Sequence, residues 1–596
     1  MLAGTIPLMV GEAVRAHGSR TAQGIWRHGQ WQSTSYARFG HQVRDVAAAL
    51  IRTGLVEGDR VAILARNCPE WTVADVGALL AGCVTVSVYT TSPAAGVRHI
   101  LNDSGARVVF VGTQTELGTV LQVWPDCPRL ELVVVLNGTK CAGAPHCLTW
   151  EDFLAGAPER VHGTEVDRRV SRIAPDALAT LIYSPGTTGA PKGVMLTHAN
   201  VLSQIAAIDD RFTLFPGERN LSVLPLAHAY ERVWSYMLIY FGMQNVYVPD
   251  PRGIRHALQR VRPHALVSTP RLYHRVHETV ERRVRAASGG SGRFEWAVRI
   301  GVEVQQARSR GYAIAPGLRA QHAAAHWLVL RHVREAIGGP KRLLSCGGSS
   351  LNPRTSELFF AAGVPIYHGY GQIETTAMTT CNSPEDLTFD TVGRAVRGCQ
   401  LRILASGEIL VRGSNVMAGY FGQTEETAAV LVDGWYHTGD MGYLTREGNL
   451  IVTDRLADRI VTAHGTTVAP QPLERAMMAH PFVERAVVIG ENRQYLTTLI
   501  QPAFTPLARH AERQGWRFRS RSELLAHPRV LGIFTRLVAE AGSDLDAHIR
   551  LRTFRLLDEA LTETHGDLSP TEGLRRAAVA ARFASVIEHM YAEVDD

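Results

Sequence analysis

Hydrophobic and polar positions alternate along the first part of the chain in the rhythm of repeated strand–helix units. Tyr36–Thr53 has apolar residues at helical spacing, and the short apolar run Arg60–Leu64 has the pattern of a buried strand. The same order continues downstream, with expected helices and strands over Trp71–Ala81, Thr85–Val88, Gly96–Ser104, Arg107–Val111 and Leu178–Tyr183. Strands that alternate with helices predict an α/β fold built on mostly parallel sheets.

Two later stretches depart from this rhythm. Val276–Ile337 is largely helical in pattern, which predicts a helical insert over about residues 276–340. Across Gln400–Gly413 the pattern changes to short strands separated by a turn. This change predicts a small β subdomain over about residues 391–453.

The length of the chain requires several packed units. A chain of 596 residues is too long for one hydrophobic core. Beyond Asp454 a compact α/β segment runs to a helix near Ala577–Met590. We therefore expect a large N-terminal domain over residues 1–453 and a small α+β C-terminal domain over residues 454–596.

Composition and charge narrow the class of protein. Hydrophobic residues make up 45% and charged residues 20%, as in ordinary globular proteins, and the formal charge of +6 is small for this length. No basic block is dense enough to predict a nucleic-acid partner or an anionic membrane, and no apolar run approaches the roughly 18 residues of a bilayer span. The N-terminus lacks the positive start of a signal peptide. We expect a cytoplasmic protein without a transmembrane segment, and a peripheral membrane contact stays open.

Cysteine and lysine usage add two observations. The eight cysteines are scattered without paired spacing and without a metal-ligand pattern, which predicts a reduced, metal-free protein. Lysine occurs only at Lys140, Lys192 and Lys341, so nearly all basic charge is arginine. A G+C-rich genome accounts for most of this bias. A lysine that stands in a chemically demanding motif is therefore a candidate for function.

The sharpest motif is Tyr183–Gly193, with the sequence YSPGTTGAPKG. A strand that leads into glycines and hydroxyl residues lets backbone N–H and side-chain O–H groups surround phosphate oxygens, and glycine avoids a Cβ that would block their approach. The spacing is not that of a Walker A loop, because Lys192 is followed by Gly193 rather than Ser or Thr. Taken alone, the motif fits a Gly/Thr-rich surface turn equally well.

Four further motifs follow in a fixed order. They are Ser345–Leu351 (SCGGSSL), His368–Thr375 (HGYGQIET), Gly434–Asp440 (GWYHTGD) and Asp454–Asp458 (DRLAD). Together the five motifs resemble those of the adenylate-forming, AMP-binding superfamily, with Pro185 where that family usually has serine. Pro225–Val233 (PLAHAYERV), Thr269–Val276 (TPRLYHRV) and the helical insert resemble the long-chain acyl-CoA synthetase branch.

The resemblance implies an ATP site with Mg²⁺. The implied ATP-binding residues are Ser184, Gly186, Thr187, Thr188, Gly189, Gly347, Gly348, Ser349, Tyr370, Gly371, Asp440 and Arg455. Tyr370 offers an aromatic face for adenine, although a core aromatic is the ordinary alternative, and Asp440 suits the ribose hydroxyls. The implied catalytic residues are Lys192, Glu374, which would hold Mg²⁺, and His228, which would lie beside the acceptor oxyanion.

The resemblance also implies a two-step reaction on a small-molecule acid. A carboxylate attacks the α-phosphorus of ATP to give acyl-AMP and pyrophosphate, and then a thiol attacks the acyl carbon. Between the steps a small, mobile C-terminal lid domain rotates about a hinge, which Asp454 matches. Relatives often form homodimers, so a homodimer is possible here.

The chain departs from the family at its C-terminal end. The family lysine that bridges the carboxylate and the α-phosphate is replaced by Gly573, and a hinge lysine is replaced by Ala457. Loss of one such cationic donor costs on the order of 10²–10³ in rate. His464 stands where a narrow pantetheine tunnel is expected, and Ile373 replaces a threonine. These changes leave coenzyme A use uncertain.

Three interpretations follow from these motifs. In the first, the chain is an adenylate-forming ligase of the long-chain acyl-CoA synthetase type with an atypical lid. In the second, it activates nitrite with ATP and converts an arylamine into a diazonium. In the third, it is a nucleotide-binding pseudoenzyme, although Lys192, Glu374 and Asp440 are intact and argue against that.

Overall fold

The structure is a computed structural model that describes most of the chain. The described residues are 4–136, 141, 146–155, 159–184, 190–288, 292–464, 466–543, 550–562, 565–568 and 574–595. The chain divides into one compact unit of Met1–Arg402, Leu410–His437 and Thr445–Leu450 and a second of Ile403–Ile409, Thr438–Leu444 and Ile451–Asp596. The division assigns two short pieces of the expected β subdomain to the second unit. The domain boundary between residues 453 and 454 stays a prediction.

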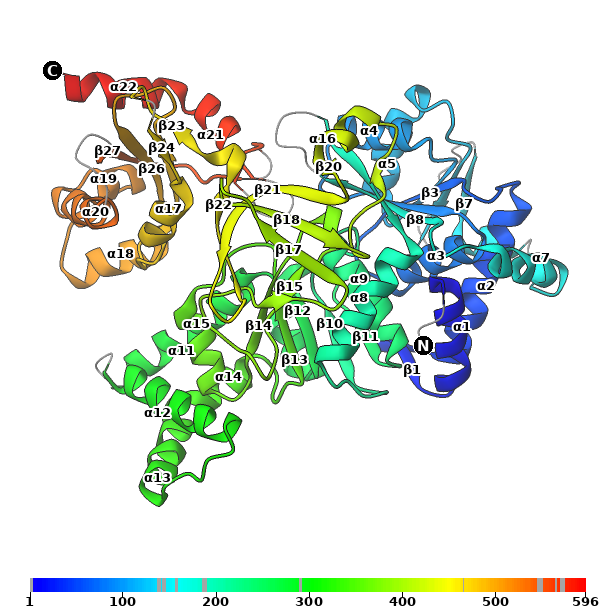
Figure 1. Cartoon of the computed structure of the whole chain (residues 1–596), viewed down its shortest axis with the longest axis horizontal. Coiled ribbons are helices and arrows are strands. Elements are labelled where there is room, and N and C mark those ends of the chain that lie inside the picture. The colour runs from blue at the N-terminus through cyan, green and yellow to red at the C-terminus, as the bar shows by residue number, and fades with distance from the viewer. Residues whose placement is uncertain are drawn as a thin grey trace. The chain divides into compact units, whose positions relative to one another are not determined.

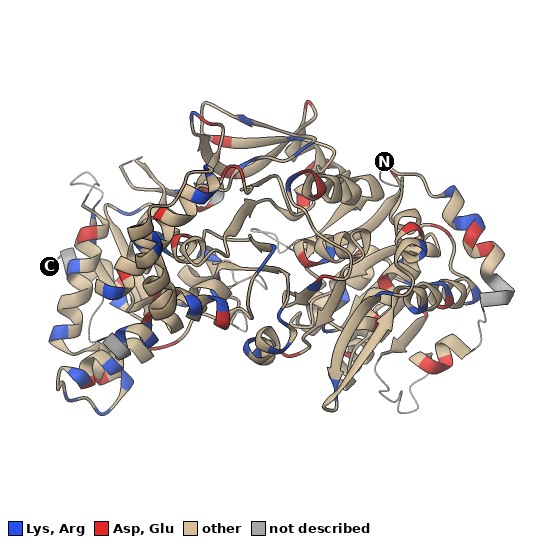
Figure 2. Cartoon of the chain, turned by 90° about the horizontal axis from the view of Figure 1, so that it is seen from below, with Lys and Arg blue, Asp and Glu red and all other residues tan. Residues whose placement is uncertain are grey.

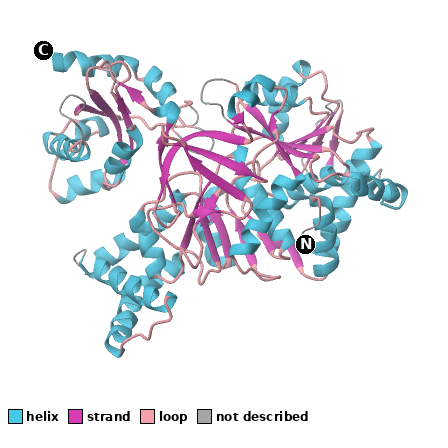
Figure 3. Ribbon diagram, viewed as in Figure 1, coloured by secondary structure: helices cyan, strands magenta, loops and turns pink. Residues whose placement is uncertain are grey.

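One sheet of the first unit has eight strands (Figure 3). Their order is β19 (Gly419–Tyr420), β9 (Lys192–Thr197), β8 (Leu178–Ser184), β4 (Val84–Ser87), β3 (Arg60–Leu64), β5 (Val108–Val111), β6 (Leu132–Val135) and β7 (Cys147–Thr149). The pairs from β8 to β7 are parallel, and β9 is antiparallel to both of its neighbours. This mostly parallel sheet confirms the predicted fold class.

The second sheet of this unit has nine strands (Figure 1). Their order is β16 (Arg394–Ala395), β15 (Thr380–Cys381), β14 (Ile366–Tyr370), β13 (Leu343–Cys346), β12 (Ala265–Ser268), β10 (Arg219–Ser222), β11 (Gln244–Tyr247), β1 (Thr21–Arg27) and β2 (Gln30–Ser35). From β14 to β1 the pairs are parallel, so the carboxyl ends of β13 and β14 meet at one edge. Ligands bind at such edges in open α/β sheets.

Helices connect and cover these strands. In chain order they are α1 (Ile6–His17), α2 (Tyr36–Arg52), α3 (Pro69–Leu80), α4 (Ala94–Ser104), α5 (Gln114–Val123), α6 (Trp150–Ala155), α7 (Glu159–Arg172), α8 (His198–Arg211), α9 (Ala229–Tyr240), α10 (Ile254–Val261), α15 (Pro353–Ala361) and α16 (Thr424–Val430). Helix α2 begins where the Ser35 side chain accepts the Arg38 N–H, and its apolar residues face the core. The helices predicted from sequence periodicity are confirmed to within a few residues.

The region predicted to be a helical insert is helical in the structure, and its role as an insert stays a prediction. It consists of α11 (Pro270–Ser288), α12 (Gly292–Ser309), α13 (Pro316–Ala325), a π-helical turn (His326–Leu330) and α14 (Arg331–Ala336). Apolar residues from all of these segments join one core cluster with α15 and with the inner strands β10 to β14 of the nine-stranded sheet. In Figure 1, α12 and α13 extend away from the two sheets of this unit.

The expected β subdomain has five strands. They are β17 (Cys399–Ile403), β18 (Glu408–Gly413), β20 (Leu431–Val432), β21 (Trp435–Leu444) and β22 (Leu450–Arg455). The sheet order is β17-β18-β21-β20, and β22 also pairs with β21. The short strand patterns predicted near Gln400–Gly413 are therefore confirmed.

The C-terminal part of the second unit is a separate α+β body. Its strands are β23 (Ile460–Val461), β24 (Thr467–Val468), β25 (Val483–Ile489), β26 (Leu496–Pro502) and β27 (Leu551–Leu556). Its helices are α17 (Pro470–Met478), α18 (Phe504–Arg513), α19 (Arg521–Leu525), α20 (Pro528–Ala541), α21 (Arg576–Arg582) and α22 (Ala584–Asp595). Strands β25, β26 and β27 form a sheet whose faces carry two separate apolar clusters, which gives this part its own core.

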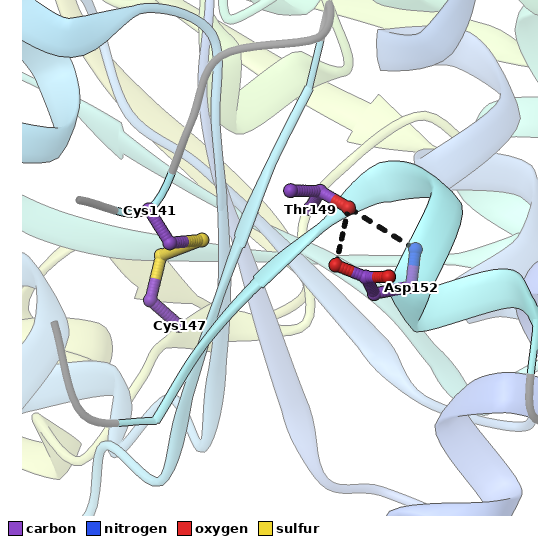
Figure 4. The surroundings of a disulfide bond; sticks show 4 residues. All are labelled: Cys141, Cys147, Thr149 and Asp152. Atoms are coloured by element: carbon purple, nitrogen blue, oxygen red, sulfur yellow. Dashed lines mark hydrogen bonds between the residues drawn. A yellow bond between two sulfur atoms is a disulfide. The ribbon is translucent and has the colours of Figure 1, made fainter. Parts of the chain in front are cut away.

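The prediction that all cysteines are reduced is wrong for one pair. Cys141 and Cys147 form a disulfide with a Cα–Cα distance of 5.7 Å (Figure 4). Beside it, the Thr149 hydroxyl donates to the Asp152 carboxylate at 2.8 Å and accepts the Asp152 N–H at 3.1 Å. The six other cysteines are free thiols.

The charge distribution, the helices and the potential metal ligands give three further findings. Basic and acidic residues are interspersed on many helices (Figure 2). Within the described ranges, no helix is long and apolar enough to cross a membrane. Likewise, in the part of the chain that the structure describes, no group of three or more His, Cys, Asp or Glu residues could hold a metal ion.

Candidate nucleotide-binding site

The glycine- and threonine-rich motif connects two antiparallel strands. In the β8–β9 hairpin, Ser184 lies opposite Lys192 at the open end of the ladder. The residues between them that were predicted to bind phosphate, Gly186, Thr187, Thr188 and Gly189, lie outside the described residues. Ser184 and Lys192 therefore flank the predicted phosphate loop, whose role stays a prediction.

Lys192 and Glu374 are connected through Tyr420. The Lys192 Nζ lies 5.1 Å from the centroid of the Tyr420 ring, which suits a cation–π contact. The Tyr420 hydroxyl donates to Glu374 Oε1 at 3.1 Å. Strand β19, which carries Tyr420, pairs antiparallel with β9, which begins at Lys192. The fold thus brings both predicted catalytic residues into contact with one aromatic side chain, Lys192 with its ring and Glu374 with its hydroxyl.

The protonation state of Tyr420 fixes the direction of that hydrogen bond. Burial, together with the neighbouring Glu374 carboxylate, raises the pKa of Tyr420 well above its usual range. Tyr420 therefore keeps its proton and donates it to Glu374. Glu374 itself is 9% exposed and lies in the short 3₁₀ helix η4 (Ile373–Thr375) directly after β14.

Tyr370, the aromatic residue predicted for adenine, and the following Gly371 stand at the carboxyl end of β14. Gly371 is required by the backbone, because a Cβ there would overlap the carbonyl group of Ala377. The neighbouring Gln372 accepts a hydrogen bond from the Tyr436 hydroxyl at 2.6 Å, which holds this turn in place. Tyr370 is partly exposed at the strand end, as a stacking surface must be.

Gly347, Gly348 and Ser349 follow the neighbouring parallel strand β13. Because β13 and β14 are parallel, these residues come to the same sheet edge as Tyr370. Gly347 is buried, whereas Gly348 and Ser349 are exposed. The backbone carbonyl of Ser349 is hydrogen-bonded to His368 Nε2 at 3.0 Å, so the two strand ends are tied together.

His228 is the N-cap residue of α9. Its Nδ1 accepts the backbone N–H of Tyr230 at 3.1 Å, so Nδ1 carries no proton. Burial lowers the pKa of His228 to about 4, so the ring is neutral near pH 7. A neutral ring with an acceptor Nδ1 must carry its proton on Nε2. His228 can therefore donate one hydrogen bond to an oxyanion.

Arg232 of the PLAHAYERV segment and Tyr236 further along α9 hold this helix against α3 and β8. The buried Arg232 donates to Thr180 Oγ1 at 2.7 Å, forms an ion pair with Asp75, and lies with its guanidinium carbon 5.3 Å from the Trp71 ring centroid. Tyr236 donates to the same Asp75 carboxylate at 2.5 Å. These contacts connect α3, α9 and β8, so they fix the position of the helix that His228 caps.

Glu231 is a buried acid that the motif assignments do not include. It lies on the first turn of α9 and is 0% exposed. Burial raises its pKa to about 8, against smaller opposing effects of the Ser222 hydroxyl and the Leu224 backbone. Glu231 is therefore neutral at pH 7. It belongs to the same PLAHAYERV segment as His228.

Asp440 and Arg455 are described within the second unit. The Arg455 Nε donates to Asp440 Oδ1 at 3.1 Å, and the Asp440 side chain is 6% exposed against 52% for Arg455. Asp440 lies on β21, where its backbone N–H donates to Thr438 Oγ1 at 3.0 Å. The structure thus pairs Asp440, the residue predicted for the ribose, with Arg455, another residue of the predicted ATP site.

The predicted hinge residue Asp454 lies in the next strand, β22. It is 1% exposed and accepts the Arg455 N–H at 2.9 Å. Burial raises the pKa of Asp454 to about 6, and Asp458 acts in the same direction. The neighbouring Thr453 carbonyl accepts a hydrogen bond from Arg475 of α17 at 2.7 Å, which ties this strand to the C-terminal body.

The departures from the family are only partly described. Gly573 lies outside the described residues, and the side chain of Ala457 is not described. His464 is exposed at the turn between β23 and β24. Of the two arginines that follow Gly573, Arg576 is held by Glu474 in a two-point ion pair at 2.7 and 3.1 Å, whereas Arg575 is exposed.

The structure therefore groups the predicted residues in two sets. In the first unit it connects Lys192 with Glu374 and brings Gly347–Ser349 to the strand end that carries Tyr370. In the second unit it pairs Asp440 with Arg455. Tyr420 and Glu231 are absent from the motif assignments. Sequence periodicity could not have identified Tyr420, because it follows the short strand pattern and belongs to no repeat of its own. Glu231 differs from a surface acid only through its burial, which the sequence does not show.

Comparison with known protein families covers both parts of the chain. A family model described as "AMP-binding enzyme" matches residues 10–421. A second, described as "AMP-binding enzyme C-terminal domain", matches residues 457–595. The first match alone spans more than half of the chain.

Individual relatives agree with these matches. The chain is 36% identical over 575 residues to the long-chain-fatty-acid–CoA ligase FadD15 of Mycobacterium bovis, a match that covers 94% of this chain and 93% of that protein. The solved anthranilate CoA ligase AuaEII, in complex with anthranoyl-AMP, aligns with a TM-score of 0.72 at 18% identity over 98% of this chain and 99% of its own. The o-succinylbenzoate CoA synthetase (MenE) of Bacillus subtilis, in complex with ATP and magnesium ion, aligns with a TM-score of 0.66 at 20% identity, with coverages of 96% and 98%. At these identities the structural likeness shows the fold.

These matches and the site define an adenylate-forming ligase that uses ATP. The chain belongs to the AMP-binding enzyme family, and its relatives place it with the acyl-CoA synthetase type. Nothing in these likenesses supports the interpretation in which nitrite is activated to convert an arylamine into a diazonium. Nothing in them supports a pseudoenzyme either.

Proposed function

We propose that this protein reacts a long-chain fatty acid with ATP to form acyl-AMP and release pyrophosphate. In the second step, coenzyme A accepts the acyl group. The substrate class is suggested by the relative named long-chain-fatty-acid–CoA ligase, which matches nearly the whole chain. The observation that carries the proposal is the connection of Lys192 to Glu374 through Tyr420. It holds a cation and a carboxylate together beside the strand hairpin that leads into the phosphate loop.

In this proposal the fatty-acid carboxylate oxygen attacks the α-phosphorus of ATP, and pyrophosphate leaves with the electron pair of the broken P–O bond. The Nε2–H of His228 donates to the acid's second oxygen and orients it. A neutral imidazole is suited to this task because it can donate without forming a tight ion pair with the substrate. Lys192 neutralises charge on the phosphates.

The residues fit a magnesium site shared with the substrate. Mg²⁺ is commonly bound by one or two carboxylates together with substrate phosphates rather than by a cage of protein ligands. Glu374 offers a buried carboxylate with one oxygen already oriented by Tyr420. When bound, the ion would neutralise phosphate charge. Glu374 is the residue that would hold it.

The ATP-binding roles follow the same proposal. Tyr370 would stack on adenine beside Gly347–Ser349, and Asp440 with Arg455 would bind the ribose. Asp454 would act as the hinge of the C-terminal lid. For these residues the support is the family resemblance together with their exposure and pairing.

We propose that both steps are slower than in relatives with the C-terminal lysine. Gly573 supplies no cation to the α-phosphate, and Arg576 is occupied by Glu474. The exposed imidazole of His464 would narrow the path of the pantetheine arm. Loss of one preorganised donor costs on the order of 10²–10³ in rate.

The experiment is pyrophosphate release from ATP with a panel of fatty acids and aryl acids, in the presence and absence of coenzyme A. We expect release that depends on long-chain acids, and its loss in Lys192→Ala. Lys341→Ala is the matched control, because Lys341 is the other lysine within the described ranges and bonds only to the Gly339 carbonyl at 3.1 Å. Release that no acid stimulates, or equal loss in both variants, would contradict the proposal.

A further inference from the structure

The net positive charge of the whole chain comes from the helical insert. Residues 270–340 contain twelve arginines and five glutamates, a net charge of +7, whereas the whole chain carries +6. The remaining 525 residues therefore carry a net charge of −1. Between Glu303 and Glu335 the chain has five arginines, three histidines and no acid. We call residues 304–335 the arm tip.

Positive groups from four helical segments of the arm tip, α12, α13, the π-helical turn and α14, influence one another. The guanidinium of Arg334 has a pKa below its usual range, because of burial and then because of Arg308. The pKa values of His322 and His326 are lowered by burial and further by neighbouring arginines, with Glu335 the one opposing acid for His326. Like charges held this close are costly unless an anion binds near them.

Large apolar side chains are exposed beside these charges. Trp327 is 63% exposed, Tyr312 is 66% exposed and Leu328 is 36% exposed. The guanidinium carbon of Arg331 lies 5.0 Å from the centroid of the Trp327 ring, so charge and aromatic surface adjoin. Trp327 and Leu328 belong to the π-helical turn, an irregularity that often marks functional positions.

This combination fits one kind of partner. An anionic bilayer surface attracts clustered arginines, and tryptophan and tyrosine insert at its headgroup level. A nucleic acid would account for the arginines, but it gives no reason for an exposed leucine beside the tryptophan. In Figure 1, α13 lies at the end of the helical insert that is away from the sheets of its unit, where a flat surface can reach it.

We propose that the arm tip binds the surface of anionic lipid bilayers, through its arginines and through Trp327 and Tyr312. This inference goes beyond the proposed function, because it assigns a partner to a surface that the nucleotide site does not use. Binding requires no substrate, so it can fail while the proposed function holds, and the reverse is equally true.

The test is flotation of the full-length protein with vesicles of phosphatidylcholine alone and of phosphatidylcholine mixed with phosphatidylglycerol. The charge variant is Arg308→Gln with Arg319→Gln, and its matched control is Arg38→Gln with Arg172→Gln; all four arginines are exposed. Each arginine near an anionic surface contributes about fivefold to partitioning, so the charge variant should bind roughly 20-fold more weakly. The control should bind like the unmodified protein.

The apolar contribution is tested separately. Trp327→Ser should weaken binding to the mixed vesicles several-fold, whereas Tyr443→Ser, which removes another half-exposed aromatic residue (52% exposed), should not. Unfolding temperatures of all variants are measured first, and these surface changes should leave them unaltered. Raising salt should weaken binding of the unmodified protein and narrow its difference from the charge variant.

Several outcomes would overturn the proposal. Equal binding to both kinds of vesicle, or no binding to either, removes the anionic surface as the partner. Equal losses in the charge variant and its control remove the arm tip as the site. Retention of a double-stranded oligonucleotide with the same arginine dependence, without vesicle binding, assigns the surface to nucleic acid instead.

Discussion

Tyr420 connects Lys192 and Glu374, the two residues that we propose for the phosphate chemistry, so replacing it by phenylalanine probes that connection directly. The change removes only the hydroxyl, which donates to Glu374 Oε1 at 3.1 Å. It keeps the ring on which Lys192 Nζ lies at 5.1 Å from the centroid. The protein should still fold, because the ring remains in its buried place on β19. The expected defect therefore concerns the orientation of the Glu374 carboxylate.

The size of the defect follows from the kind of hydrogen bond. A hydrogen bond to a charged group contributes about 1.5–3 kcal/mol when one partner is removed. This range corresponds to a loss of roughly 10- to 150-fold in kcat/KM for ATP. Tyr420→Leu also removes the ring, and the lost cation–π contact should cost a further factor of about 2–5.

The assay is ATP–pyrophosphate exchange with a long-chain fatty acid, repeated over a range of Mg²⁺ concentrations. If Glu374 holds Mg²⁺, Tyr420→Phe should raise the Mg²⁺ concentration needed for half-maximal activity. The matched control is Tyr240→Phe. It removes a tyrosine hydroxyl on α9 that donates to Asp209 on α8 at 3.1 Å. Activity within twofold of the unmodified protein, with an unchanged Mg²⁺ requirement, would refute this reasoning.

Three further predictions concern other parts of the site. Tyr370→Ala and Asp440→Ala should each weaken ATP binding measured by calorimetry; unchanged affinity in both would remove them from the nucleotide site. Gly573→Lys should raise acyl-AMP formation tenfold or more, about 1.4 kcal/mol, because it returns a cation to the α-phosphate, and no gain would contradict the proposed cause of the slower steps. Because burial raises the pKa of Glu231 from 4.5 to about 8, its neutral form contributes stability that is full below pH 4.5 and lost as pH rises through 8. Chemical denaturation should show that loss, and Glu231→Gln should abolish it; a Glu231→Gln protein with the same pH profile would count against a neutral Glu231.

Local sequence predicts the regular elements well, because hydrophobic periodicity depends on neighbours along the chain. The strand predicted over Arg60–Leu64 is β3 with the same bounds, and the helix predicted over Tyr36–Thr53 is α2 with one residue fewer. The helical insert and the short strands near Gln400 are likewise present. Each of these features is encoded within about a dozen residues.

Contacts between distant segments are what the sequence leaves open. Tyr420 meets Lys192 only because β19 pairs with β9, a register that no local pattern specifies. The engagement of Arg576 with Glu474 depends in the same way on the packing of α21 against α17 and β25. The disulfide between Cys141 and Cys147 was missed because their spacing matches no familiar motif.

The most direct test of the account is acid-dependent formation of AMP and pyrophosphate by the unmodified protein. The protein is incubated with ATP, Mg²⁺ and either a long-chain fatty acid, a short-chain acid, or nitrite with an arylamine. The account predicts AMP and pyrophosphate in equal amounts with the long-chain acid, and an acyl thioester when coenzyme A is added. ATP binding without turnover on any long-chain acid, or turnover that requires nitrite and an arylamine, would contradict it.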